Sequence, residues 1–186
     1  MIMKILVLGA PNQKISGILR EDGHHVLEKE TPIDVQFLKE KKIDFAVSYG
    51  YRHIIKSNVL HHLKDRIINL HISYLPWNRG ADPNLWSFLE DTPKGVTIHY
   101  VDEGIDTGDI IAQKEVVFEQ GEQTLSTTYA RLQDEMMLLF KSNWPLISSG
   151  GGYTPTPSTA RWHVSPCFRQ AVFQQTLAQR MGHACE

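Results

Sequence analysis

Short apolar runs alternate with segments of helical spacing through the first two thirds of the chain. This alternation is typical of an α/β fold with a parallel sheet. The apolar runs predict strands at Lys4–Leu8, His25–Glu28, Asp44–Ser48, Ile67–His71, Gly95–Val101 and Ile110–Phe118. Apolar positions that recur at steps of three and four residues predict helices at Gln13–Glu21, Asp34–Lys41, Pro83–Leu89 and Thr124–Trp144.

The last of these helices divides the chain into two regions. Thr124 can cap its first turn, and Leu125, Leu132, Met136 and Phe140 lie along one stripe. The stretch SSGGGYTPTPSTAR that follows is rich in glycine, proline, serine and threonine and has no periodicity, which indicates a loop. We therefore expect one domain at residues 1–149, followed by a loop and C-terminal tail at residues 150–186.

Composition limits the kinds of partner that the protein can have. Hydrophobic residues make up 41% and charged residues 22% of the 186, as in soluble globular proteins. The net charge of −2 gives no general attraction for nucleic acid or anionic lipid. The first apolar run stops at Pro11, too early for a secretory signal. The two cysteines, Cys167 and Cys185, are expected as free thiols, so a cytoplasmic location is predicted.

The turn after the first strand argues against a nucleotide cofactor. Its sequence, LGAPN at residues 8–12, has neither the G-x-G-x-x-G fingerprint nor the phosphate-binding G-x-x-x-x-G-K-[ST] loop. No metal site is expected either, because the histidines pair as direct neighbours, His24 with His25 and His61 with His62, rather than four apart on a helix.

The stretch INLH ends the fourth predicted strand with two polar side chains. Asn69 and His71 are two apart, so they should project from the same side of the strand, about 6.6 Å from each other along it. Ile68 and Leu70 should face the opposite side. Ligands of open α/β sheets bind at the carboxyl ends of strands. An amide that donates to an oxyanion and a histidine that moves a proton suit attack on a carbonyl group.

A histidine in this role needs an acidic partner that fixes its tautomer. The best candidate is Asp106 in VDEGIDTGDII, because Gly104 and Gly108 let the backbone turn sharply around it. Asp102, Glu103 and Asp109 are alternatives, and spacing alone does not choose among the four acids.

Two separated motifs, NLHISYLPWNRGADPNLW and GVTIHYVDEGIDTGDI, resemble the folate-dependent formyltransferase family. Its pattern is N-x-H-x-S-x-L-P, then an R-G turn, then a D-x-G loop further along. The resemblance implies a Rossmann-like, mostly parallel sheet, 10-formyltetrahydrofolate as co-substrate, and an amine as acceptor. It also implies that Asn69 and His71 stabilise a tetrahedral intermediate, that His71 accepts the amine proton, and that Asp106 positions His71 and a water.

The resemblance also implies two binding regions. The pterin would lie between two loops, and the residues expected to bind it are Tyr49, Gly50, Tyr51, Arg52, Asp102, Glu103, Gly104 and Ile105. SYGYR together with LPWNRGADPNLW is most similar to sugar N-formyltransferases, so the acceptor would be an amino sugar, free or nucleotide-linked. Ser73, Trp77, Arg79 and Gly80, in a loop expected to be exposed, would bind this acceptor, with Trp86 as a further candidate. A homodimer remains open.

Other functions use the same residues. A 10-formyltetrahydrofolate hydrolase would replace the amine with water, and a phosphoribosylglycinamide-type formyltransferase would take a different amine. A binding module without catalysis would hold folate and transfer nothing. An esterase built on Ser73 is disfavoured because the chain has no G-x-S-x-G turn.

Overall fold

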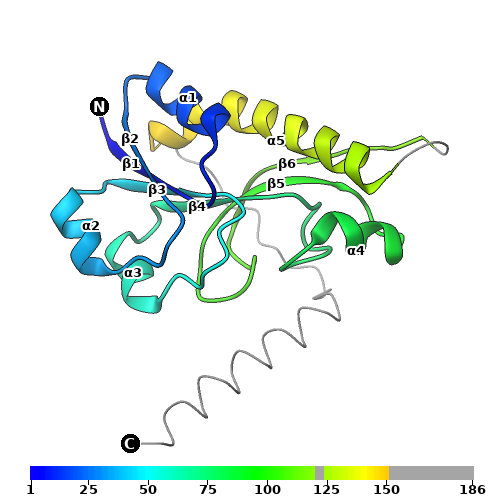
Figure 1. Cartoon of the computed structure of the whole chain (residues 1–186), viewed down its shortest axis with the longest axis horizontal. Helices are drawn as coiled ribbons and strands as arrows, with labels where there is room; N and C mark the ends of the chain where they lie inside the picture. The colour runs from blue at the N-terminus through cyan, green and yellow to red at the C-terminus, as the bar shows by residue number, and fades with distance from the viewer. Residues whose placement is uncertain (120–123, 151–186) are drawn as a thin grey trace, which may run out of the picture.

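The computed structural model describes residues 1–119 and 124–150, which form a six-stranded sheet with helices on both faces (Figure 1). The strands are β1 (Lys4–Leu8), β2 (His25–Lys29), β3 (Phe45–Ser48), β4 (Ile67–His71), β5 (Gly95–Tyr100) and β6 (Ile110–Glu115). The helices are α1 (Gln13–Glu21), α2 (Val35–Lys41), α3 (Ser57–His62), α4 (Pro83–Leu89) and α5 (Leu125–Ser148). Of the predicted loop and tail at residues 150–186, everything from residue 151 on, including both cysteines, lies outside the described residues.

The sheet is parallel in its first four strands and antiparallel in its last two. The strand order is β2-β1-β3-β4-β5-β6, and β5 runs antiparallel to both β4 and β6. The predicted mostly parallel α/β fold is confirmed, but the expectation of a parallel arrangement is wrong for β5. Two neighbouring parallel strands need a connection that crosses over one face of the sheet. The connection from β4 to β5 contains α4, which contacts α5, and the connection from β5 to β6 is a short loop without a helix.

Two hydrophobic clusters hold the helices to the sheet. On one face, α1 and α5 bury residues such as Leu19, Met136 and Phe140 against β1, β3, β4 and β5. On the other face, α2 and α3 bury Leu38 and Val59 against β1, β3 and β4. Figure 1 shows α1 and α5 on one side of the sheet and α2 and α3 on the other. The central strands are covered on both faces, which fits their almost wholly apolar sequences.

α5 begins as predicted but extends further. The Thr124 hydroxyl accepts from the Thr127 N–H at 3.1 Å and caps the first turn. The predicted end at Trp144 is four residues short, because the helix continues through Pro145 to Ser148. An interior proline removes one helical hydrogen bond and crowds the preceding turn, but the side chains of Trp144 and Ile147 on either side of it pack on the core.

The pattern missed α3 completely. This helix has six residues, its N-terminus has no side-chain cap, and Val59 is its one buried residue. Too few apolar positions repeat in so short a segment to produce a helical period.

Within the described residues, no helix is long and apolar enough to cross a membrane.

Candidate functional site

β4 carries the polar pair that the sequence singled out. Ile68 and Leu70 enter the core beneath α1 and α5, whereas Asn69 and His71 both extend to the carboxylate of Asp106. Asn69 stands directly opposite His99 on the antiparallel strand β5, so these two side chains share a face of the sheet. The strand alternation therefore places one amide and two imidazoles around a single carboxylate.

Asp106 is the acid on which these groups converge. Its Oδ1 accepts from Asn69 Nδ2 at 3.1 Å, and its Oδ2 accepts from the Gly80 N–H at 2.8 Å. His71 Nε2 lies 3.5 Å from Oδ2, and His99 Nε2 lies 3.5 Å from Oδ1. Both carboxylate oxygens are thus engaged, each by one hydrogen bond and one imidazole.

The other three acids of this loop take no part in that cluster. The carboxylate of Asp102 accepts from the Gly104 N–H and the Thr107 hydroxyl, which closes its own turn. Glu103 accepts from the Ser57 hydroxyl at 2.7 Å, and Asp109 is exposed. Of the four acids, Asp106 is therefore the one whose carboxylate lies beside His71.

The surroundings of Asp106 keep its carboxylate ionised. Burial alone would raise its pKa, but His71, His99 and the Gly80 N–H favour the charged form more strongly and hold the pKa well below its usual range. The backbone at Asp106 has a φ of 49°, a left-handed conformation that aspartate adopts more readily than most residues. The loop therefore presents a fixed negative charge to the two imidazoles.

His71 is a neutral imidazole in this environment. Burial lowers its pKa, and the opposing effect of Asp106 does not restore it. Its Nε2 lies 3.2 Å from the Asn78 carbonyl oxygen as well as near Asp106, and both of these groups only accept. The proton of the neutral ring is therefore assigned to Nε2, which leaves the lone pair on Nδ1. A neutral histidine with an unprotonated nitrogen can act as a base.

His99 is the residue of this site that the sequence reasoning missed. It is 1% exposed, and its Nδ1 lies 2.7 Å from the Tyr100 carbonyl, to which an N–H there donates. Its Nε2 lies 3.3 Å from Asn69 Nδ2 and 3.5 Å from Asp106 Oδ1. The signal was present in GVTIHY, where Thr97 and His99 are polar residues two apart in an apolar strand, the same pattern as in β4.

The loop after β4 packs against β5 and β6, whereas the sequence led us to expect an exposed loop. The Thr97 hydroxyl donates to the Ser73 carbonyl at 2.7 Å, and the Gln113 amide donates to the Leu75 carbonyl at 2.6 Å. The Leu75–Pro76 peptide is cis. Because side chains of β5 and β6 satisfy the loop's backbone groups, the loop lies against these strands instead of standing in solvent.

Burial changes the part that the predicted acceptor-binding side chains can play. The Ser73 hydroxyl is 3% exposed and donates to the Trp77 carbonyl at 2.8 Å within the loop. Arg79 is 1% exposed; burial lowers its pKa, against the opposing charges of Asp106 and Asp102. Trp77 is half-buried, and Gly80 donates to Asp106. Of the four predicted residues, only Trp77 and Gly80 keep appreciable exposure.

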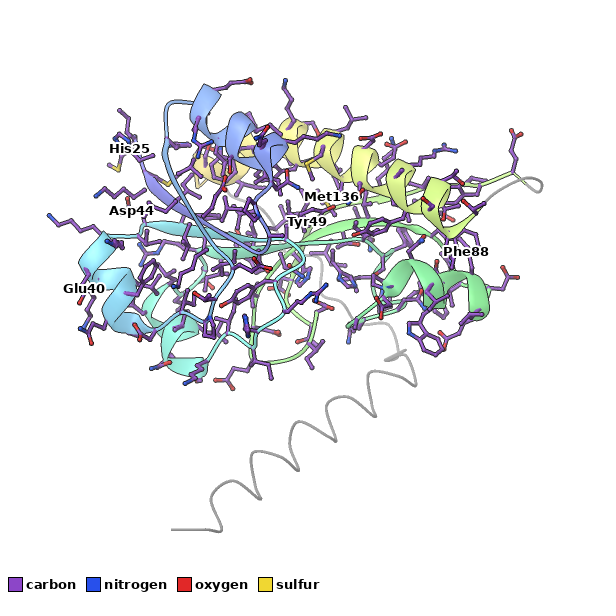
Figure 2. The ribbon with its side chains drawn as sticks, in the orientation of Figure 1. His25, Glu40, Asp44, Tyr49, Phe88 and Met136 are labelled. Atoms are coloured by element: carbon purple, nitrogen blue, oxygen red, sulfur yellow. The ribbon has the colours of Figure 1, made fainter. Side chains whose placement is uncertain are left out.

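The predicted pterin loops also divide into packed and exposed residues. Tyr49 and Met136 lie on the side of the sheet that α5 covers (Figure 2), and burial raises the pKa of Tyr49 to about 12. The Tyr51 hydroxyl donates to the Thr31 carbonyl at 3.1 Å. Residues that face solvent are Gly50, Arg52, Asp102, Glu103, Gly104 and Ile105. The hydrogen bond from Ser57 to Glu103 joins the segment after β3 to the loop that carries Asp106.

No group of three or more histidine, cysteine, aspartate or glutamate side chains in residues 1–119 and 124–150 is arranged to hold a metal ion.

Comparison with known proteins identifies the family. Residues 24–141, more than half of the chain, match the formyl transferase family. The chain belongs to this family. The matched segment contains Asn69, His71, His99 and Asp106, and the resemblance predicted from the two motifs is confirmed.

Individual formyltransferases resemble the chain to different extents. The crystal structure of the formyltransferase PseJ from Anoxybacillus kamchatkensis, in complex with UDP-4,6-dideoxy-4-formamido-L-AltNAc and tetrahydrofolate, superposes with a TM-score of 0.80 at 45% identity, over 91% of this chain and 90% of that one. Methionyl-tRNA formyltransferase from Thermodesulfovibrio yellowstonii is 33% identical over 161 residues, which are 82% of this chain and 50% of that enzyme.

A sugar-directed relative is also similar in sequence. The dTDP-4-amino-4,6-dideoxyglucose formyltransferase of Mycobacterium bovis is 35% identical over 94 residues, half of this chain and 40% of that protein. The chain spans between a third and a half of the length of these curated relatives.

Proposed function

We propose that this protein is an N-formyltransferase that moves a formyl group from 10-formyltetrahydrofolate to the amine of an amino sugar, carried on a nucleotide. The observation that carries the proposal is the convergence of Asn69 and His71 on Asp106, within 3.1 and 3.5 Å. The choice of co-substrate and acceptor is supported by the similarity to PseJ, whose complex holds tetrahydrofolate and a nucleotide-linked formamido sugar. We assign this chemistry to a catalytic domain at residues 1–149.

Formyl transfer needs one group to accept a proton and another to stabilise negative charge. The acceptor amine attacks the formyl carbon, a new C–N bond forms, and the carbonyl oxygen becomes an oxyanion. His71 takes the amine proton at Nδ1, because its Nε2 already holds a hydrogen directed at Asn78 and Asp106. The tetrahedral intermediate then collapses: the oxyanion re-forms the carbonyl and the bond from the formyl carbon to the folate nitrogen breaks. That nitrogen receives the proton from His71, and the formamide product is left.

Asn69 stabilises the negative charge of the oxyanion, and so does His71 once it is protonated. The Asn69 amide hydrogens point at Asp106 and His99 in this structure, so an N–H that turns to the oxyanion gives up one of these contacts. The negative charge of Asp106 stabilises the imidazolium that forms when His71 takes the proton. Asp106 therefore raises the basicity of a ring that burial keeps neutral at rest.

The exposed parts of the two predicted loops form the proposed folate side. Gly50 and Arg52 follow β3, and Ile105 lies on the loop of Asp106, with the Ser57–Glu103 hydrogen bond between these segments. On the acceptor side we retain Trp77 and Gly80. Ser73 and Arg79 are assigned instead to holding the loop in shape.

The test is a direct assay of transfer with the full chain. The protein is incubated with 10-formyltetrahydrofolate and a panel of amino sugars, each free and nucleotide-linked, and products are analysed by mass spectrometry. We expect a nucleotide-linked amino sugar to gain one carbonyl unit, CO, when N–H becomes N–CHO. His71→Ala and Asp106→Ala should lower turnover by about a hundredfold or more while folate binding, measured by calorimetry, persists.

Different outcomes would reject the proposal in different ways. Formate release with no modified sugar would identify a hydrolase. Folate binding without either product would identify a binding module. Formylation of phosphoribosylglycinamide but of no amino sugar would keep the reaction and replace the acceptor.

A further inference from the structure

Asn78 sits at the point where the loop after β4 meets His71. It is completely buried, and its main-chain carbonyl lies 3.2 Å from His71 Nε2. Its φ of 51° is in the left-handed region, which asparagine adopts more readily than most other side chains. This conformation turns the Asn78 carbonyl to the imidazole.

The side chain of Asn78 is clamped at both ends. Its Nδ2 donates to Glu90 Oε2 at 3.1 Å, and its Oδ1 accepts from the Thr92 hydroxyl at 2.6 Å. Glu90 is the C-cap residue of α4, and Thr92 lies two residues further along the chain. The amide donor and the amide acceptor are both used, so the residue is held in one orientation against the end of α4.

Two acceptors lie near Nε2 of His71, and both favour a proton on that nitrogen. Asp106 Oδ2 lies 3.5 Å from Nε2, beyond a normal hydrogen bond, whereas the Asn78 carbonyl satisfies the geometry of one. Among residues 1–119 and 124–150, the structure gives Nδ1 of His71 no hydrogen-bonding group. The charged or titratable groups around the ring are Asp106, His99 and Arg79, which come from the β5–β6 loop, β5 and the loop after β4.

We propose that Asn78 is a positioning residue for formyl transfer: its clamped carbonyl holds the proton of neutral His71 on Nε2 and so reserves Nδ1 for the amine proton. This inference rests on the proposed function for its catalytic meaning, but the tautomer itself is a property of the resting protein. A catalytic histidine in the wrong tautomer can lose up to about ten-thousandfold in rate. A partly mixed tautomer therefore lowers turnover without touching either substrate.

Thr92 provides the cleanest perturbation of the clamp. Thr92→Val keeps the shape of the side chain and removes the hydroxyl that donates to Asn78, whereas Thr92→Ser keeps that hydroxyl. Asn78→Gly is the second variant, because glycine keeps the left-handed backbone without strain and removes both side-chain contacts. Ser16→Ala is the matched control: it also deletes a fully buried hydroxyl, whose hydrogen bond goes to Glu28 beneath α1, away from His71.

Two measurements decide the proposal. Nitrogen-15 NMR of histidine-labelled protein reads the tautomer of His71 without any substrate, and steady-state kinetics separates kcat from KM. We expect the wild type and Ser16→Ala to show the Nε2–H form. Thr92→Val and Asn78→Gly should show a mixture of tautomers and about a tenfold lower kcat, with the KM for the folate unchanged. Thr92→Ser should restore the wild-type tautomer and most of the lost kcat.

An Nδ1–H tautomer in the wild type overturns the inference, and so does a pure Nε2–H form in both clamp variants, even if their kcat falls. In the second case the clamp acts on stability alone. Failure of the proposed function looks different: the wild type would transfer no formyl group to any acceptor, while His71 still shows the Nε2–H form and responds to the clamp variants.

Discussion

Asp106→Asn tests the electrostatic logic of the site with almost no change in shape. The carboxylate accepts at both oxygens, from Asn69 Nδ2 and from the Gly80 N–H. An asparagine at position 106 has one accepting oxygen and one donating nitrogen. If its oxygen stays with Gly80 and His71, its NH₂ faces the NH₂ of Asn69, and two donors meet. Asn69 can relieve that conflict only by flipping its amide, which turns the oxyanion donor away.

The size of the effect follows from the two functions that are lost together. His71 loses the anion that supports its protonated form, and Asn69 loses its orientation. General acid–base catalysis contributes a factor of about 10² to 10⁴ in rate, so turnover should fall by that factor. This corresponds to an activation barrier that is higher by roughly 3–5 kcal/mol. Loss of hydrogen bonds to a charged group should also cost about 1–3 kcal/mol of folding free energy at neutral pH.

The stability loss should depend on pH in a defined direction. The pKa of Asp106 is lower in the folded protein than in the unfolded chain, so the carboxylate stabilises the fold above its unfolded pKa of about 3.9, and that contribution disappears as the pH falls further. The gap in melting temperature between wild type and Asp106→Asn should therefore be widest near neutral pH and narrow on acidification.

The assay combines single-turnover formyl transfer with thermal melts followed by circular dichroism between pH 3 and pH 7. Asp109→Asn is the matched control, because it removes the same charge from an exposed position in the same loop and should leave both readouts near wild type. A rate for Asp106→Asn within about threefold of wild type, where catalysis predicts a hundredfold or more, would refute the reasoning. An equal loss in Asp109→Asn would show that only the net charge of the loop matters.

Three further predictions concern pH, the loop and the core. Because burial lowers the pKa of His71, the base form should persist below the ordinary histidine pKa of about 6.5; a fall in kcat/KM that begins above that pH would contradict a neutral buried base. Ser73→Ala removes the hydrogen bond to the Trp77 carbonyl and should lower the unfolding free energy by about 0.5–1.5 kcal/mol in urea titrations, with little change in turnover; a large loss of turnover in the folded variant would return Ser73 to the substrate site. Phe140→Ala empties a completely buried position beside Trp144 and should cost about 3–5 kcal/mol in the same titrations; a cost below 1 kcal/mol would mean that α5 is not docked as described.

The sequence predicted the central strands well because their signal is local. β1, β3 and β4 are short apolar runs buried on both faces, and their bounds lie within one residue of the prediction. Asn69 and His71 stood out for the same reason, as polar residues at the end of such a run. Alternation along one strand is sufficient to show which residues share a side.

The features that the sequence did not predict depend on contacts between distant segments. Nothing in GVTIHY reveals that β5 runs antiparallel to β4, and only this direction places His99 opposite Asn69. The burial of Arg79 likewise depends on a loop whose backbone groups are satisfied by Thr97 and Gln113, on two other strands. A proline-rich loop looks exposed until those partners are known. The sequence could not distinguish Asp106 from the three nearby acids for the same reason, since only contacts with distant segments separate them.

The irregularity in the last pair of strands has a consequence for any redesign of this domain. The β5–β6 pairing shifts register between Ile98 and His99, where Ile98 pairs with Ala112 and His99 pairs with Ile110. Ile111 is thus an extra residue that puts the two strands out of register shortly after the connection that carries the carboxylate. Deleting Ile111 would even the ladder and pull that connection along by one residue, about 3.3 Å, which exceeds the tolerance of every contact Asp106 makes. A redesigned β5–β6 loop, for example one meant to accept a different formyl donor, must therefore keep this register shift. Its length should be changed only in the solvent-exposed part of the loop.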